Sequence, residues 1–222
     1  MLTPEKILEL ARGEIGTKES PAGSNRVKYN TVYYGREVSG ASLHWCVVFI
    51  WWLFHEGGAP ELFFGGNRTA YCPALQNFHK GQWVADNYKP GDIIFFNFQL
   101  GFNAQHVGIC ESYDGKYITT IDGNTGSWNE ANGGAVMRKH RHKKYIVGAY
   151  RPKYEEEETV TQEQFDAMME NYLARQKQKE PTADWMIDGI ERAKQAGISD
   201  GSSPLGLCTR AEAMMMATAA KN

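Results

Sequence analysis

The sequence of 222 residues predicts an α+β fold in which helices precede an antiparallel sheet. Apolar residues recur at helical spacing near the N-terminus and fill a second segment around residue 50, whereas short β-rich runs follow residue 90. A hydrophobic content of 42%, with 12% aromatic residues, is enough for a packed core. Because the β-rich runs follow one another without intervening helices, we expect antiparallel pairing.

The first predicted helix covers residues 4–13. Its apolar residues recur at helical spacing and are Ile7, Leu8, Leu10 and Ala11. Pro4 suits the first turn of a helix. Gly, Ser, Asn and Tyr are frequent in residues 13–40, which therefore predict mainly loop.

The second predicted helix covers residues 46–56 and follows from the stretch "HWCVVFIWWLF". Apolar residues occupy every side of its first turns, so other elements must enclose it. The sequence "HEGG" closes the helix, and Gly57 or Gly58 supplies its C-terminal cap.

The strands begin after the turn Pro90-Gly91-Asp92, with the β-rich run Ile93–Phe98. The later runs are "QHVGICESY", "KYITTIDGN", "GGAVMRKH" and "KYIVGAYRP". Asp114-Gly115 predicts a hairpin between the first two of these. We expect an antiparallel meander that completes a domain of residues 1–152.

The composition changes after residue 152. Residues 153–181 are highly charged, and their apolar residues at helical spacing are Phe165, Met168, Met169, Tyr172 and Leu173. We interpret this segment as a linker helix because it offers little apolar surface; self-association through the 161–178 helix is the alternative. Residues 182–222 predict a small helical module, with helices in "ADWMIDGIERAKQAG" and "TRAEAMMMATAAK".

The charge, the apolar runs and the cysteine content of the sequence exclude several classes of protein. A net charge of −2, from 24 basic and 26 acidic residues, argues against a nucleic-acid partner. No apolar run is long enough to cross a bilayer, and the N-terminal segment is an amphipathic helix rather than a signal peptide. We therefore expect synthesis in the cytoplasm without a signal peptide and no membrane insertion. The four cysteines form no CxxC pair, which favours free thiols.

Cys46 is a candidate nucleophile because it stands at the start of the predicted buried helix. A thiol attacks as its thiolate, and both the positive end of a helix and a nearby imidazole lower its pKa. The alternative is that Cys46 fills the core as a small hydrophobe, which buried cysteines commonly do. The choice depends on whether another segment supplies a base.

Among the six histidines, His106 is the candidate base. It opens the β-rich run "HVGIC", so it should face the same space as Ile93–Phe96 and the buried helix. His55 is about 13 Å further along the helix of the cysteine. His140 and His142 lie in "RKHRHKK", which we interpret as a solvated strand end. A core histidine bonded to a backbone carbonyl is the alternative role for His106.

A basic imidazole needs an acceptor on its second nitrogen. In "YITTIDGN", Asp122 and Asn124 share parity, so both face one side of the sheet. The hairpin makes residues 105–111 and 117–122 antiparallel neighbours, which places Asp122 within a residue or two of His106 across the pair. The composition of "IDGN" also suits a turn.

Four segments in this order, "WCVVFIWW", "KPGDIIFFNF", "HVGICES" and "TTIDGN", resemble the core motifs of the CHAP family. These are cysteine, histidine-dependent amidohydrolases and peptidases that cut bacterial peptidoglycan, often as phage or prophage endolysins. The resemblance covers about residues 5–152 and implies a papain-like fold. It also implies Cys46 as nucleophile, His106 as base, and an acidic residue with Asn124 steadying the imidazole. Family members usually carry Glu where Asp122 stands, so either Asp122 or Asn124 is the main partner of His106.

The resemblance implies an enzyme that cleaves a peptidoglycan amide, either the muramoyl–alanine bond or a peptide bond of the stem or cross-bridge, after release to the cell wall. Trp45, Trp128 and the Tyr-rich 29–34 loop are candidates to line its groove. No cofactor is expected. Some members bind calcium through acidic residues ahead of the cysteine, and "NTVYYGREVSGASLH" has no such cluster, so we expect no metal.

The C-terminal segment "ADWMIDGIERAKQAGISDGSSPLGLCTRAEAMMMATA" resembles an S-layer-homology module. That resemblance implies either binding to wall polymers or a packed helical appendage.

Two other functions are compatible with the same residues. A zinc peptidase would use His106, Cys110 and Asp122, but zinc peptidases generally contain more histidine ligands, and no HExxH motif is present. In a non-catalytic wall-binding protein, Cys46 and His106 would only fill the core. Acyl transfer by a Cys46 thiolate is the favoured interpretation.

Overall fold

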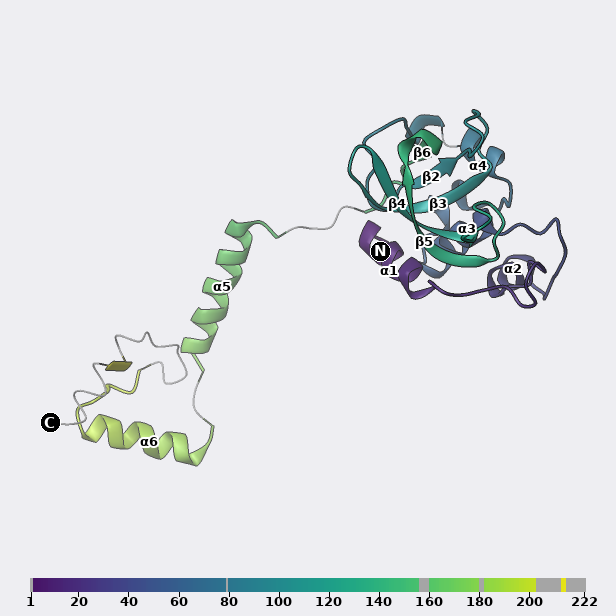
Figure 1. Ribbon diagram of the computed structural model, residues 1–222. Helices are drawn as coiled ribbons and strands as arrows, with labels where there is room; N and C mark the ends of the chain where they lie inside the picture. Colours follow the sequence, from purple (N-terminus) through teal and green to yellow (C-terminus); the bar gives the residue numbers. More distant parts are fainter. Residues whose placement is uncertain (1, 79, 156–159, 180–181, 203–212, 215–222) are drawn as a thin grey trace. The chain divides into compact units, whose positions relative to one another are not determined.

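The computed structural model describes residues 2–78, 80–155, 160–179, 182–202 and 213–214 (Figure 1). The chain divides into two compact units, Met1–Glu157 and Glu158–Asn222. The first unit contains helices and a six-stranded antiparallel sheet, so the predicted α+β fold is confirmed.

The helices of the first unit lie ahead of most of the sheet in sequence. They are α1 (Pro4–Gly13), α2 (Lys28–Tyr34), α3 (Cys46–Glu56) and α4 (Cys72–Phe78), with short 3₁₀ turns at Pro60–Leu62, Phe64–Gly66, Lys80–Gln82 and Lys143–Tyr145. Helix α1 begins after Thr3, whose hydroxyl oxygen accepts a hydrogen bond from the backbone N–H of Lys6. This cap and Pro4 explain why the helix starts where the sequence predicts.

Helix α2 lies in the segment for which the sequence predicts mainly loop, and that prediction is wrong for these seven residues. The helix is too short to produce a clear periodicity. Tertiary contacts stabilise it instead: the Tyr29 ring packs against Trp45 and Trp52, and the Asn30 amide donates to backbone carbonyls outside the helix. Gly35, with a φ of 70°, ends it.

Helix α3 is enclosed, as its composition requires, and every residue from Cys46 to Phe54 is buried. It packs on strands β3 (His106–Tyr113) and β4 (Tyr117–Thr125). The contact with β4 is close because residue 123 is glycine: a Cβ there would lie 2.4 Å from the Cβ of Phe49. The backbone of β4 therefore brings its polar residues near the start of α3.

The other strands are β1 (Trp83–Val84), β2 (Ile93–Phe96), β5 (Ala135–His142) and β6 (Ile146–Tyr150). The strand order is β1-β6-β2-β3-β4-β5, so β2 to β5 form the expected meander. Strand β6 departs from the meander because it crosses back to pair with β2 and β1. This crossing covers the edge of β2 that a simple meander would leave open.

The sheet separates two groups of buried side chains. Val107, Ile109 and Ile121 face the main core with α3, whereas Ile94, Phe96, Cys110 and Ile118 belong to a second, smaller cluster. Alternation along each strand produces the two faces.

In the second unit, α5 (Gln162–Lys177) and α6 (Asp184–Gln195) occupy the positions predicted from the charged stripe and from "ADWMIDGIERAKQAG". Thr161 and Gln164 form a reciprocal capping box at the start of α5. The predicted helix "TRAEAMMMATAAK" lies outside the described residues, apart from 213–214.

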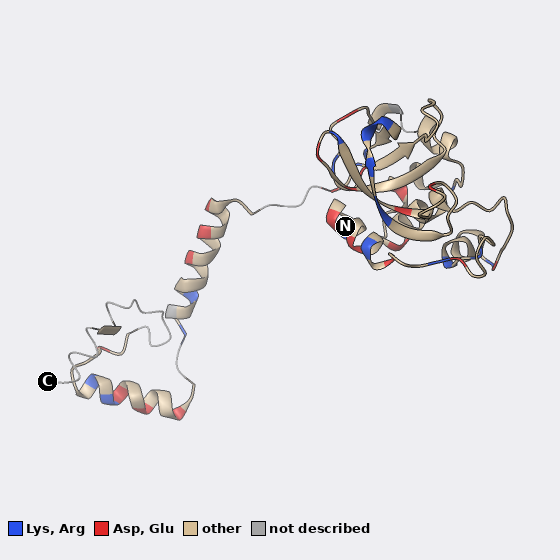
Figure 2. Ribbon diagram, in the orientation of Figure 1, with Lys and Arg blue, Asp and Glu red and all other residues tan. Residues whose placement is uncertain are grey.

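Charges are arranged along both helices of the second unit with acidic residues first and basic residues last (Figure 2). In α6, Asp184 lies in the first turn and Arg192 and Lys194 in the last. This order complements the helix dipole. Within the described part of the chain, no helix has the length and apolar character to span a bilayer.

Candidate active site

Cys46 is the first residue of α3 and is almost completely buried. The first backbone N–H groups of a helix have no acceptor within the helix, so they create a positive environment around this position. The backbone N–H of Val47 also donates to the thiol sulfur. Both effects favour the thiolate.

His106 is the first residue of β3 and is fully buried. Its Nε2 lies 2.9 Å from Oδ2 of Asp122. Its Nδ1 has no hydrogen-bond partner of standard geometry among the described residues. If Nε2–H donates to Asp122, Nδ1 is the nitrogen that exchanges a proton with Cys46.

Asp122 reaches His106 because the strand opposite it carries a glycine. A Cβ on Gly108 would lie 2.0 Å from Oδ1 of Asp122, so the carboxylate occupies the volume that a side chain at 108 would need. The Thr120 hydroxyl donates to the same Oδ1 at 2.6 Å. These contacts hold the carboxylate in one orientation.

Arg141 stabilises the negative charge of Asp122. Its Nη1 lies 2.7 Å from Oδ2 of Asp122, and its side chain is only 5% exposed. Burial alone would raise the pKa of Asp122, but the Arg141 charge and the hydrogen bond from His106 lower it to about 2. Asp122 is therefore a carboxylate at neutral pH.

Cys46 and His106 form a thiol–imidazole pair. Burial alone would lower the pKa of His106, but its hydrogen bond to Asp122 and its interaction with the neighbouring Cys46 thiolate raise it to about 9. The pKa of Cys46 lies well below its ordinary value, first because of a hydrogen bond from Cys72, and also because of His106. Together these shifts favour a thiolate beside an imidazolium.

Among the described residues, Asn124 makes no hydrogen bond to the His106 imidazole. It is buried with a φ of 56°, and its Oδ1 accepts the backbone N–H of Gly134 at 3.3 Å. Its backbone carbonyl accepts the N–H of Gly133. Asn124 thus closes the β4–β5 connection, while Asp122 holds His106.

Two residues of the site were missed by sequence reasoning. Cys72, the first residue of α4, has its sulfur 3.7 Å from that of Cys46, and nothing in its local sequence signals this contact. Arg141 belongs to the stretch interpreted as a solvated strand end, an interpretation that is wrong for this residue. The alternation of side chains along β5 was the available signal. Met137 pairs with Asp122, and Arg141, four residues later, faces the same side of the sheet.

A groove of about 600 Å³ leads to Cys46 and Cys72. Tyr71 and Phe102 line it with side chains 66% and 90% exposed. The other lining residues are His44, Ala70, Pro73, Asn97, Gly101, Asn103, Ala104, Gln105, Ala131 and Asn132. His44 Nδ1 lies 3.2 Å from Oδ1 of Asn132. The groove therefore presents neutral polar and aromatic groups.

The aromatic residues expected in the groove lie elsewhere. Trp45 is fully buried, and neither Trp128 nor the 29–34 segment belongs to the lining residues. Tyr71 and Phe102 line the groove instead. The sequence did not predict this because both residues lie in loops, where no periodic pattern marks exposure.

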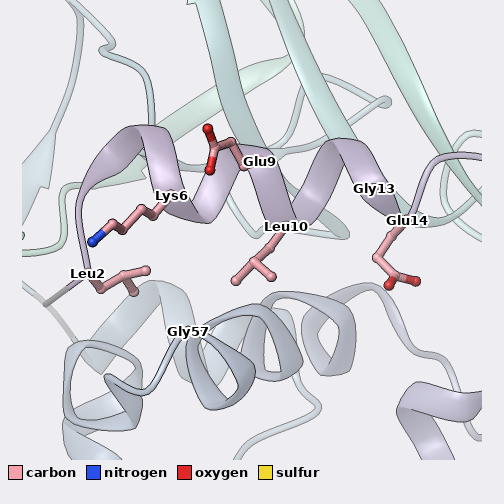
Figure 3. Close-up of a pocket in the computed structure, with 7 residues that line it drawn as sticks. All are labelled: Leu2, Lys6, Glu9, Leu10, Gly13, Glu14 and Gly57. Atoms are coloured by element: carbon pink, nitrogen blue, oxygen red, sulfur yellow. The ribbon is translucent and has the colours of Figure 1, made fainter. Parts of the chain in front are cut away.

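A second hollow of about 490 Å³ lies along α1 and is bounded by Gly57 (Figure 3). Leu2 and Leu10 point toward the neighbouring helix, whereas Glu9 points away from it. None of the candidate catalytic residues lines this hollow.

Of the three residues of the zinc alternative, only His106 and Asp122 are in contact. Cys110 is buried in the second core cluster, where burial raises its pKa to about 12. In the described part of the chain, no three His, Cys, Asp or Glu side chains are arranged to hold a metal ion.

Residues 38–124 match the family described as CHAP domain, and this range includes Cys46, His106, Asp122 and Asn124. No curated protein matches the chain. Among solved structures, the chain is similar to one described as the crystal structure of a wild type endolysin, LysIME-EF1, with 17% identity and a TM-score of 0.47. The match covers 70% of this chain and 66% of that chain, which is less than two thirds of its length.

Proposed function

We propose that the chain is a peptidoglycan hydrolase that cleaves an amide bond by acyl transfer to Cys46, because residues 38–124 match the family described as CHAP domain. The observation that carries this proposal is the arrangement of Cys46, His106 and Asp122: a thiol with a lowered pKa beside an imidazole whose other nitrogen meets a carboxylate at 2.9 Å. A nucleophile, a base and a group that orients the base are the parts required for this chemistry.

The reaction follows from the protonation states. The Cys46 thiolate attacks the amide carbonyl carbon, and the backbone N–H of Cys46 donates to the oxyanion that forms. The His106 imidazolium then gives its proton to the leaving amine, and the C–N bond breaks. Water attacks the thioester, His106 accepts a proton from it, and the acid leaves as the thiolate is restored.

The two units have separate roles in this proposal. Residues 1–152 carry the chemistry, residues 153–181 serve as a linker that contains α5, and residues 182–222 are the segment that binds wall polymers. The enzyme acts on the bacterial cell wall after release. The substrate amide is the muramoyl–alanine bond or a peptide bond of the stem or cross-bridge, and no cofactor takes part.

The test compares Cys46→Ala and Cys46→Ser with Cys110→Ala, a control that removes a buried thiol from the second cluster. We expect the Cys46 variants to lose lysis of purified walls and the Cys110 variant to retain it, provided that all three stay folded by circular dichroism. Mass spectrometry of the released fragments identifies the bond that is cut. Wall binding by the wild-type protein without any new amine or acid would instead support the non-catalytic alternative.

A further inference from the structure

Cys46 and Cys72 are 26 positions apart in the sequence, yet their sulfur atoms lie 3.7 Å apart. Both thiols are free, and both line the groove that leads to the surface. Small molecules in the groove therefore have access to the pair, although each residue is largely buried. The catalytic scheme uses only one of these two thiols.

We propose that Cys46 and Cys72 form a modification site for hydroperoxides, in which Cys72 captures oxidised Cys46 as a reversible disulfide. The inhibitory consequence of this modification rests on the proposed function of Cys46, whereas the disulfide itself does not. The class of co-reactant is a hydroperoxide, ROOH.

The chemistry balances in two steps. The Cys46 thiolate attacks the terminal oxygen of ROOH, so an S–O bond forms, the O–O bond breaks, and RO⁻ leaves as ROH after taking a proton. Sulfur is oxidised to the sulfenic acid, and the peroxide is reduced. Cys72 then attacks the sulfenic sulfur, so an S–S bond forms, the S–O bond breaks, and water leaves with the Cys72 proton.

The electrostatics assign a different step to each sulfur. The Cys72 thiol, at 3.7 Å, and the neighbouring His106 and Val47 N–H all lower the pKa of Cys46, so Cys46 is the thiolate that reacts first. The hydrogen bond that Cys72 donates to this thiolate, its burial and the negative charge of Cys46 keep the pKa of Cys72 above the ordinary value, so Cys72 stays a thiol while Cys46 is reduced. Conversion of Cys46 to a neutral sulfenic acid removes that charge, which lowers the pKa of Cys72 and activates it for the second step.

The geometry also determines the product. A sulfenic acid without a nearby thiol is oxidised further to sulfinic acid, which common reductants do not restore. Here the second sulfur is already in contact, so disulfide formation precedes a second oxidation. A dithiol then returns both cysteines to the reduced state.

The experiment treats the full chain with hydrogen peroxide, digests it without reduction and maps the disulfide by mass spectrometry. We expect a linked pair of peptides containing Cys46 and Cys72, with the loss of two hydrogen atoms. Lysis of walls should fall in parallel, and dithiothreitol should restore it fully. Absence of the Cys46–Cys72 peptide while Cys46 becomes sulfinic acid would overturn the proposal, whether or not the protein hydrolyses walls.

Two variants distinguish capture from simple oxidation. In Cys72→Ser, a hydroxyl replaces the thiol, so peroxide should drive Cys46 to sulfinic acid and dithiothreitol should no longer restore the lost activity. Each variant is compared with its own untreated sample. Cys110→Ala is the matched control and should behave like the wild type. Equal recovery of wild type and Cys72→Ser after long exposure would contradict the role of Cys72.

Discussion

Arg141 Nη1 and Asp122 Oδ2 lie 2.7 Å apart, and the same carboxylate oxygen lies 2.9 Å from His106 Nε2. A buried arginine thus supports the residue that orients the imidazole. The guanidinium stacks over the Phe96 and Phe98 rings and also bonds Glu130, in the loop whose residues 131 and 132 line the groove. Arg141 therefore connects the Asp122 carboxylate with one wall of the groove.

The first prediction concerns Arg141→Gln. Removal of one partner of a buried ion pair should cost about 3–5 kcal/mol of unfolding free energy. Without the guanidinium, the pKa of Asp122 should rise, so the acid limb of kcat/KM should move to higher pH. Urea unfolding and a pH profile of wall lysis measure the two effects, and Arg141→Lys should restore part of each.

The control for this prediction is Arg138→Gln on the same strand. Arg138 pairs with Glu111 but is half exposed, so its loss should cost no more than about 1 kcal/mol and leave the pH profile in place. A shift of the pH profile of equal size in both variants would mean that Arg141 acts through the net charge of the protein and not through its contact with Asp122.

The second prediction separates Asp122 from Asn124 as partners of His106. In Asp122→Asn, the imidazole loses a negative acceptor, so its pKa should fall from about 9 and kcat should drop about a hundredfold or more. In Asn124→Gly, the positive φ is preserved and only the amide is lost, so kcat should change little. Iodoacetamide alkylation of Cys46 at neutral pH gives a second readout, and it should slow only in Asp122→Asn. Comparable losses in both variants would show that Asn124 also orients the ring.

The sequence predicts the neighbourhood of His106 and Asp122 because both lie on one hairpin, where register and parity determine which side chains meet. The sequence predicts α3 because a continuous apolar run of this kind must be buried in the core. The same reasoning fails for β6, whose crossing to the far side of β2 depends on the whole sheet, and for α2, which tertiary contacts stabilise.

Arg141 and Cys72 could not be assigned to the site from local sequence. A cation among six other basic or histidine residues in "RKHRHKK" resembles a solvated strand end, and only the buried carboxylate opposite explains its burial. Cys72 meets Cys46 because the first residues of α3 and α4 lie together in the fold, a relationship that no periodicity encodes.

The third prediction is the pH dependence of activity and of stability. The thiolate–imidazolium pair requires Cys46 to be ionised and His106 to be protonated, so kcat/KM should fall at low pH and again as pH rises through about 9. The folded pKa of His106 is raised from 6.5, so its contribution to stability is complete below 6.5 and is lost as pH rises through about 9. Asp122 has a lowered pKa, so its contribution is present above 3.8 and is lost as pH falls through about 2.

Urea unfolding of the wild type and of His106→Asn across the alkaline range tests the linkage. The difference in unfolding free energy between the two proteins should shrink as pH rises through about 9, because only the wild type carries the raised pKa. A constant difference would mean that the imidazole is not charged in the folded state.

The last prediction concerns Gly108, whose missing side chain makes room for the Asp122 carboxylate. In Gly108→Ala, the new Cβ would lie 2.0 Å from Oδ1 of Asp122, so the carboxylate must move away from His106. Wall lysis should fall sharply, and the pKa of His106, followed by NMR titration of its ring protons, should decrease. Gly13→Ala is the matched control, since a Cβ there meets nothing within 4 Å at the end of α1, and replacing a helical glycine should stabilise the fold by up to about 1 kcal/mol. Full activity in Gly108→Ala would mean that the carboxylate can hold the imidazole from another position and that the close approach at Gly108 is not required.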